Sequence, residues 1–178
     1  MYPEYGFVFV GDSGQADALT AQLMLSEGVA DGTSRVIATF IHDLRQDEND
    51  GRAASQAFKS LSPDIIVTKT SAYARGVIVF RNYIQAAVIA QTHASALGDL
   101  ITVDGLARVT KAALEGFVAH EADFQEAGKA DSRTQLRVQY RQDAEDAYRI
   151  LAAIADKPGL LESEVKAIRR ILDEALVD

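Results

Sequence analysis

The chain has 178 residues, of which 48% are hydrophobic, so we expect one domain with a true core and room for an appendage. Its 26 acidic and 18 basic residues give a net charge of −8, which argues against non-specific nucleic-acid binding and against a polybasic membrane anchor. The lack of cysteine excludes disulfides and thiolate metal sites. No apolar run approaches the roughly 20 residues of a spanning helix, and the first residues do not resemble a signal peptide, so we expect a cytoplasmic protein.

The first strong signal is the apolar run at residues 7–10, which predicts a strand buried on both faces. Gly11 ends this run, Asp12 stands at its carboxyl end, and a helical pattern begins near Asp17. Ligands of open α/β sheets bind outside the carboxyl ends of the strands, and Mg²⁺ prefers oxygen ligands. The two carboxylates are therefore a candidate cation site. The alternative is that Asp12 caps the strand end and Asp17 is an acid at a helix N-terminus.

A strand–helix–strand unit follows from the next segments. Residues 18–25 are rich in helix formers, and residues 36–41 predict a second buried strand. A unit of this length predicts parallel strands with a right-handed crossover. His42 and Asp43 follow the second strand, so we expect them to line the same pocket as Asp12, the alternative being a polar rim.

The middle of the chain predicts a short helix at residues 53–61 and strands at residues 64–68 and 77–80. The last two segments also fit a hairpin, because the stretch between them is short and poor in helix formers. Three cations of this region are candidate phosphate contacts, although such residues are more often simply solvated: Lys69, Arg75 and Arg81. Three aromatic residues are candidates for a lipid or headgroup pocket, with core packing the commoner role for the last two: Tyr73, Phe80 and Tyr83.

The rest of the chain is predicted to be helical. Helices are expected at residues 83–97, after a cap at Thr102 or Asp104, after a capping box at residues 132–135, and from about residue 161. Residues 121–129 are polar and predict a linker. The last two helices are amphipathic and are expected to form a hairpin that packs on the core, the alternative being that it packs on a partner.

One seven-residue stretch carries a family resemblance: Gly11-Asp12-Ser13-Gly14-Gln15-Ala16-Asp17. It resembles the metal-binding fourth motif of the haloacid dehalogenase superfamily and, in its full length, the catalytic domain of the actin-patch-type phosphatidate phosphatases. Residues 36–43, 79–87 and 100–106 are similar to the same branch. The resemblance covers residues 2–124 and implies the carboxyl-terminal half of a haloacid-dehalogenase-like, Rossmannoid parallel sheet. It leaves residues 125–178 as a helical hairpin extension.

The resemblance also implies a function. It implies a Mg²⁺-dependent phosphatidate phosphatase-like protein of lipid metabolism, with Asp12 and Asp17 as metal ligands. Phosphate contacts are implied at Ser13, Gly14 and Gln15. The implied substrate is a phosphorylated small molecule or a phospholipid headgroup.

The nucleophile of that superfamily is missing from this chain. The family's Asp-x-Asp-x-(Thr/Val) motif lies upstream of the metal motif, and here only six residues precede the first strand. Asp43 follows a strand as a phosphoryl-accepting Asp would, but Arg45 stands where the second acid belongs, so we reject it. We therefore expect the chain to be inactive alone. The alternative is a non-catalytic binding or oligomerisation module, such as a homo-oligomer or a complementing fragment.

A rival enzyme class arises from the same stretch. Gly-Asp-Ser after a buried strand resembles the first block of the Gly-Asp-Ser esterases, with Ser13 as nucleophile. Such enzymes need a histidine base, usually within Asp-x-x-His. No acid stands three positions before any of the three histidines, which are His42, His93 and His120. The expected triad therefore cannot be assembled.

Overall fold

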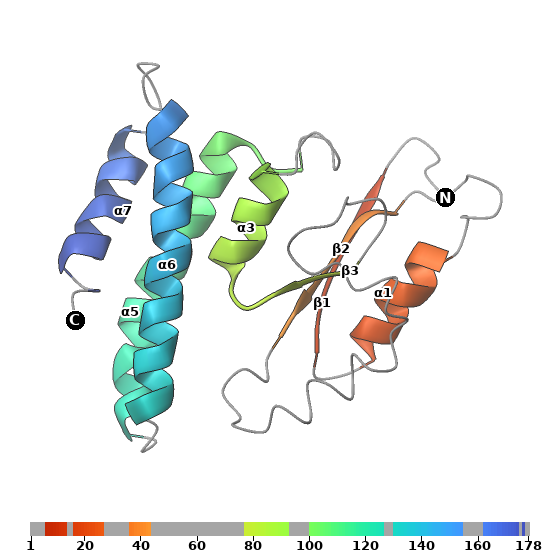
Figure 1. Cartoon of the computed structure of the whole chain (residues 1–178), viewed down its shortest axis with the longest axis horizontal. Helices are drawn as coiled ribbons and strands as arrows, with labels where there is room; N and C mark the ends of the chain where they lie inside the picture. The colour runs from red at the N-terminus through yellow and green to blue at the C-terminus, as the bar shows by residue number, and fades with distance from the viewer. Residues whose placement is uncertain are drawn as a thin grey trace. The chain divides into compact units, whose positions relative to one another are not determined.

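The computed structural model describes residues 6–13, 16–26, 36–43, 77–92, 100–126, 130–154, 162–174 and 176. The chain divides into two compact units, Met1–Asn82 and Tyr83–Asp178. The described elements of the first unit are β1 (Phe7–Asp12), α1 (Asp17–Ser26), β2 (Val36–His42) and β3 (Val77–Phe80) (Figure 1). Those of the second unit are α3 (Tyr83–Thr92), α5 (Val103–Glu126), α6 (Ala130–Ile154) and α7 (Glu162–Glu174).

The described part of the first unit is a small α/β sheet. Its three strands are parallel and follow the order β1-β2-β3. The ladder ends with Asp12 opposite His42, and His42 opposite Phe80. Helix α1 covers one face, where Ala21 and Leu25 pack with residues of β2 and β3. The predicted strand–helix–strand unit with parallel strands is confirmed.

Strand β1 is less buried than its apolar sequence predicts. Phe7 is 45% exposed, Val8 43% and Val10 56%. In the described sheet β1 pairs with β2 on one side only, whereas β2 lies between two strands and buries residues 38–41. The prediction that β1 is buried on both faces is therefore wrong, because these side chains are partly exposed and the run lies at the edge of the described sheet.

Several predicted features of the first unit lie outside the described residues. They are the helix at residues 53–61, the strand at residues 64–68 with its hairpin alternative, and the candidate contacts Lys69, Tyr73 and Arg75. The strand at residues 77–80 is confirmed as β3.

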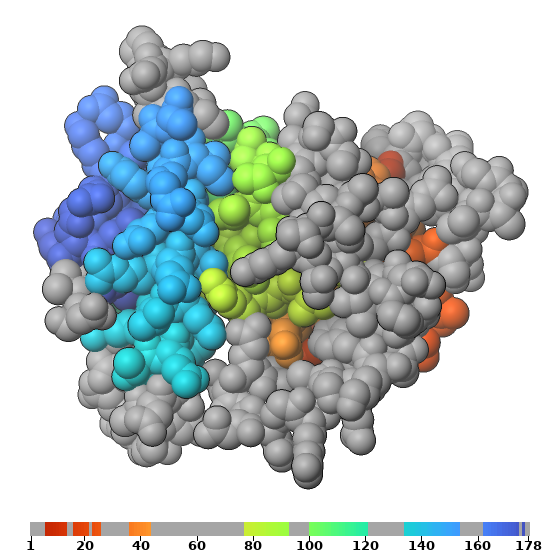
Figure 2. Space-filling model, viewed as in Figure 1, coloured from red at the N-terminus to blue at the C-terminus, as the bar shows by residue number. Residues whose placement is uncertain are grey.

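The second unit is a helical bundle around a shared core. All four described helices of this unit contribute fully buried side chains, among them Ile84, Leu106, Leu151 and Ile168. The Phe117 and Tyr140 rings stack with centroids 4.4 Å apart. Burial raises the pKa of Tyr140, and the nearby Asp143 carboxylate raises it further. Figure 2 shows α6 and α7 side by side on one face of this unit, and the prediction that they pack on a core is confirmed.

Helix boundaries differ from the sequence prediction in the second unit. Helix α5 continues to Glu126 and α6 begins at Ala130, so the predicted linker at residues 121–129 is mostly helical and the predicted capping box falls inside α6. The expected domain boundary at residue 124 likewise falls inside α5, whereas the two units divide after Asn82. The physical reason is that α5 and α6 share one core with α3 and α7.

The predicted cap of α5 is confirmed at Thr102. Its Oγ1 accepts a hydrogen bond from the Gly105 N–H at 3.0 Å, which satisfies one of the unpaired donors of the first turn.

Within the residues that the structure describes, no helix has both the length and the apolar character needed to cross a membrane. The cytoplasmic location stays a prediction.

Two glycines of α5 are expected to respond oppositely to alanine. A Cβ at Gly116 would meet no atom within 4 Å, so Gly116→Ala should raise the free energy of unfolding by about 1 kcal/mol, the difference in helix propensity. A Cβ at Gly105 would lie 2.8 Å from Ile101 Cγ1. In Gly105→Ala this overpacking should offset the gain in helix propensity, so the free energy of unfolding should not rise. Urea unfolding followed by circular dichroism measures both. Equal stabilisation of the two variants would contradict the packing of this first turn.

Candidate functional site

The carboxyl ends of the three described strands lie side by side. The Ser13 N–H donates to the His42 carbonyl at 2.8 Å, and the Asp43 N–H donates to the Phe80 carbonyl at 2.8 Å. These hydrogen bonds continue the β1–β2 ladder to Ser13 and the β2–β3 ladder to Asp43, one residue past the end of each strand. Ser13 and Asp43, the residues that follow β1 and β2, are thereby held at one edge of the sheet.

The motif after β1 is fixed by the Asp17 carboxylate. Asp17 is the first residue of α1, and its Oδ2 accepts a hydrogen bond from the Asp12 N–H at 3.1 Å. A Cβ at Gly11 would lie 2.5 Å from the same oxygen and 2.7 Å from Asp17 Cβ. Glycine is needed at position 11 because the carboxylate packs directly against the backbone. The side chain of Asp17 thus ties the end of β1 to the start of α1.

A second contact joins the ends of β1 and β2. Ser13 is 1% exposed, and its Oγ donates to Asp43 Oδ1 at 3.3 Å, a long hydrogen bond. The contact places the Asp43 carboxylate beside the Asp12-Ser13 segment. Sequence reasoning missed this pair, although the signal was present, because the two residues each follow one of two adjacent parallel strands.

His42 is held by β3. Its ring stacks on Phe80 with centroids 5.0 Å apart and planes 8° apart. The Arg81 carbonyl lies 3.0 Å from His42 Nε2, so Nε2 carries the proton in this contact. The Ser13 hydroxyl is bonded to a carboxylate and His42 Nε2 to a backbone carbonyl. This geometry gives no support to a Ser13 nucleophile activated by His42.

The structure brings together part of the predicted site. Asp12, Asp17 and Ser13 lie around the β1–α1 connection, with Asp43 beside them. Gly14 and Gln15, the other predicted phosphate contacts, lie outside the described residues. Among the side chains that the structure describes, no three or more His, Cys, Asp or Glu residues form a group that could hold a metal ion.

Comparisons with protein-family models, with curated proteins and with solved structures found no match to this chain.

Gly11→Ala is expected to destabilise the first unit. The new methyl group would overlap the Asp17 side chain, and relief requires the carboxylate to leave the Asp12 N–H. Overpacking of this kind costs roughly 1–3 kcal/mol, which urea unfolding would detect. The matched control is Gly116→Ala, where the same substitution meets open space. A Gly11→Ala variant as stable as the parent would contradict this account of the motif.

Proposed function

We propose that the carboxyl ends of β1 and β2 form the Mg²⁺- and phosphate-binding edge of a phosphatidate phosphatase-like protein with a partial haloacid-dehalogenase-like sheet. The observation that carries the proposal is the contact of Asp17 with the Gly11–Asp12 backbone. This contact gives a physical reason for the glycine and for the second acid of the motif. It also leaves the Asp12 side chain at the strand end, where α/β sheets bind ligands.

Each residue of the motif has a separate role in this proposal. Asp12 is a direct ligand of the ion. Asp17 uses Oδ2 for the Asp12 N–H, so its contribution to the ion is through water from the other oxygen. Asp43 adds a second negative charge from the neighbouring strand. Carboxylates and water are the ligands that Mg²⁺ prefers.

The phosphate of the substrate would lie over the same edge. The Ser13 hydroxyl donates to Asp43 and the Ser13 N–H donates to the His42 carbonyl, so the direct phosphate contacts of this proposal are assigned to Gly14 and Gln15. The bound ion supplies charge neutralisation at the phosphate oxygens. The substrate class is a phosphomonoester on a small molecule or a phospholipid headgroup.

We expect binding without turnover by the 178-residue chain. The sequence contains no Asp-x-Asp pair at any position, so it does not supply the aspartate nucleophile motif of the family that it resembles. Turnover would need a complementing segment that brings this motif to the sheet.

The exposed strand β1 favours a second candidate function. Apolar side chains on an unpaired strand edge are a template for pairing with another strand. In the described sheet β1 pairs on one side only, and Phe7, Val8 and Val10 are each more than two-fifths exposed. The alternative to a phosphatase-like site is therefore a docking or oligomerisation module that adds a strand at β1.

A metal titration tests the first function. Mn²⁺ added as a paramagnetic substitute for Mg²⁺ should broaden the amide signals of Asp12, Ser13 and Asp43 in the parent chain. Asp12→Asn should abolish this broadening, because it removes the direct carboxylate ligand. The matched control is Asp104→Asn, which removes an acid at the start of helix α5 and should leave the broadening unchanged. Broadening that persists in Asp12→Asn would exclude Asp12 as the ligand.

The same chain should not hydrolyse para-nitrophenyl phosphate in the presence of Mg²⁺, because the sequence lacks the nucleophile motif. Release of nitrophenol is followed by absorbance. Turnover by the parent chain that is lost in Asp12→Asn would overturn the prediction of inactivity while supporting the metal site.

Sedimentation velocity over a concentration series tests the second function. We expect association that rises with concentration and is suppressed by Val10→Lys, since an edge lysine opposes strand pairing. Val138→Lys is the matched control, because Val138 is 43% exposed but lies on α6. A monomer at every concentration, or equal suppression by both substitutions, would count against docking at β1.

A further inference from the structure

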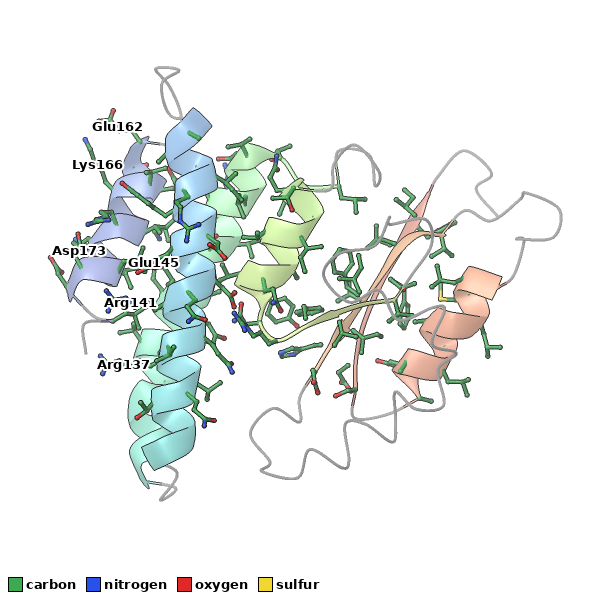
Figure 3. All side chains as sticks on the ribbon, viewed as in Figure 1. Arg137, Arg141, Glu145, Glu162, Lys166 and Asp173 are labelled. Atoms are coloured by element: carbon green, nitrogen blue, oxygen red, sulfur yellow. The ribbon has the colours of Figure 1, made fainter. Side chains whose placement is uncertain are left out.

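A cavity of about 300 Å³ lies between α6 and α7 in the second unit. Six polar side chains that line it are Arg141, Glu145, Tyr148, Arg149, Arg169 and Asp173. In Figure 3, Arg141 and Glu145 project from α6 towards α7, which carries Asp173. The volume is at the lower end of the range of small-molecule sites.

Both acids that line this cavity, Glu145 and Asp173, form ion pairs with arginines. Arg141 Nε lies 3.1 Å from Glu145 Oε1, and Arg169 Nε lies 2.7 Å from Asp173 Oδ2. The third arginine, Arg149, pairs at 2.8 Å with Asp146, which is not part of the lining. Each of the three guanidinium groups of the lining is therefore paired with one carboxylate, two within the lining and one beside it.

After these ion pairs are made, most of the hydrogen-bonding groups that remain available in the cavity are donors. Arg141 uses Nε for Glu145 and Nη1 for the Leu176 carbonyl at 2.9 Å, which leaves Nη2. Arg169 uses Nε, which leaves both Nη groups, and Arg149 uses Nη2, which leaves Nε and Nη1. Guanidinium groups cannot accept hydrogen bonds, so these positions require a ligand that supplies acceptors, and an oxyanion matches both their donors and their charge.

The cavity also has an apolar side. Leu172 is part of the lining, and the Tyr148 ring lies beneath the Arg169 guanidinium, whose Cζ is 5.5 Å from the ring centroid. An aromatic ring and an aliphatic side chain next to arginines suit a ligand with a charged end and an apolar body.

We propose that this cavity binds a small organic anion, in which a carboxylate or phosphate group is attached to an aromatic or apolar body. The anion contacts the free Nη groups of Arg169 and the free donors of Arg149, and the body lies against Tyr148 and Leu172. Planar guanidinium groups bind both kinds of oxyanion through two hydrogen bonds. The site belongs to the second unit and requires neither Asp12 nor a metal ion.

Nuclear magnetic resonance titration of the full chain tests the proposal. Benzoate and phenyl phosphate are titrated in EDTA, which removes any contribution from the proposed Mg²⁺ site. The amide signals of Tyr148, Arg149 and Arg169 should shift, with a dissociation constant of about 1 mM or tighter for at least one probe. The tighter probe identifies the preferred oxyanion, and inorganic phosphate, which has no body, should bind at least about tenfold more weakly.

Three variants separate the roles of charge, geometry and ring. Arg169→Gln should weaken binding about tenfold, because a charge-assisted contact is lost. Arg169→Lys keeps the charge but loses the planar fork, so it should also weaken binding. Tyr148→Leu should weaken the aromatic probes more than inorganic phosphate. The matched control is Arg108→Gln, which removes an arginine paired four residues away with Asp104 in α5 and should change nothing.

Two results would overturn the proposal. The first is the absence of saturable shifts at Tyr148, Arg149 and Arg169 with either aromatic probe. The second is an equal loss of affinity in Arg169→Gln and Arg108→Gln, which would show that the anion responds to overall charge only. Asp12→Asn should bind the probes as the parent does, so failure of the Mg²⁺ proposal leaves this one standing.

Discussion

The hydrogen bond from the Asp12 N–H to the Asp17 carboxylate determines the geometry of the first unit's candidate site. It closes the turn between β1 and α1, and it sets the carboxylate against Gly11, where no side chain fits. With the turn closed, α1 returns over the sheet so that Ala21 and Leu25 are buried. The same bond fixes the backbone that carries Asp12 and Ser13, so packing and the candidate chemistry depend on one contact.

The second unit is stabilised by burial of apolar side chains, with ion pairs in a smaller role. Its core is contiguous across α3, α5, α6 and α7, whereas the ion pairs among its described residues join residues three or four apart on one helix and are exposed to solvent. Exposed pairs of this kind contribute little to stability. Arg141 differs, because it also bonds the Leu176 carbonyl and so links α6 to the segment after α7.

Sequence patterns predicted which segments form strands and helices, but they did not predict how buried each element is or which residues it contacts. The parallel strands β1 and β2, the helix starting at Asp17 and the cap at Thr102 follow from short-range preferences, and each is present. The exposure of Val10 was not predictable, because an apolar run looks the same at an edge and at the centre of a sheet. The contact of Ser13 with Asp43 could have been found from the ends of the two adjacent parallel strands, whereas the cavity between α6 and α7 depends on how the two helices pack, so the sequence showed only its individual residues.

The open space beside Gly116 has a practical consequence. The chain has no cysteine, so a cysteine introduced at this exposed position would be a unique thiol for a spin label or a fluorophore. A second cysteine in place of Leu19, which is 55% exposed on α1, would put a label on the other unit. The distance distribution between the two labels would then report the arrangement and the motion of the two units in solution.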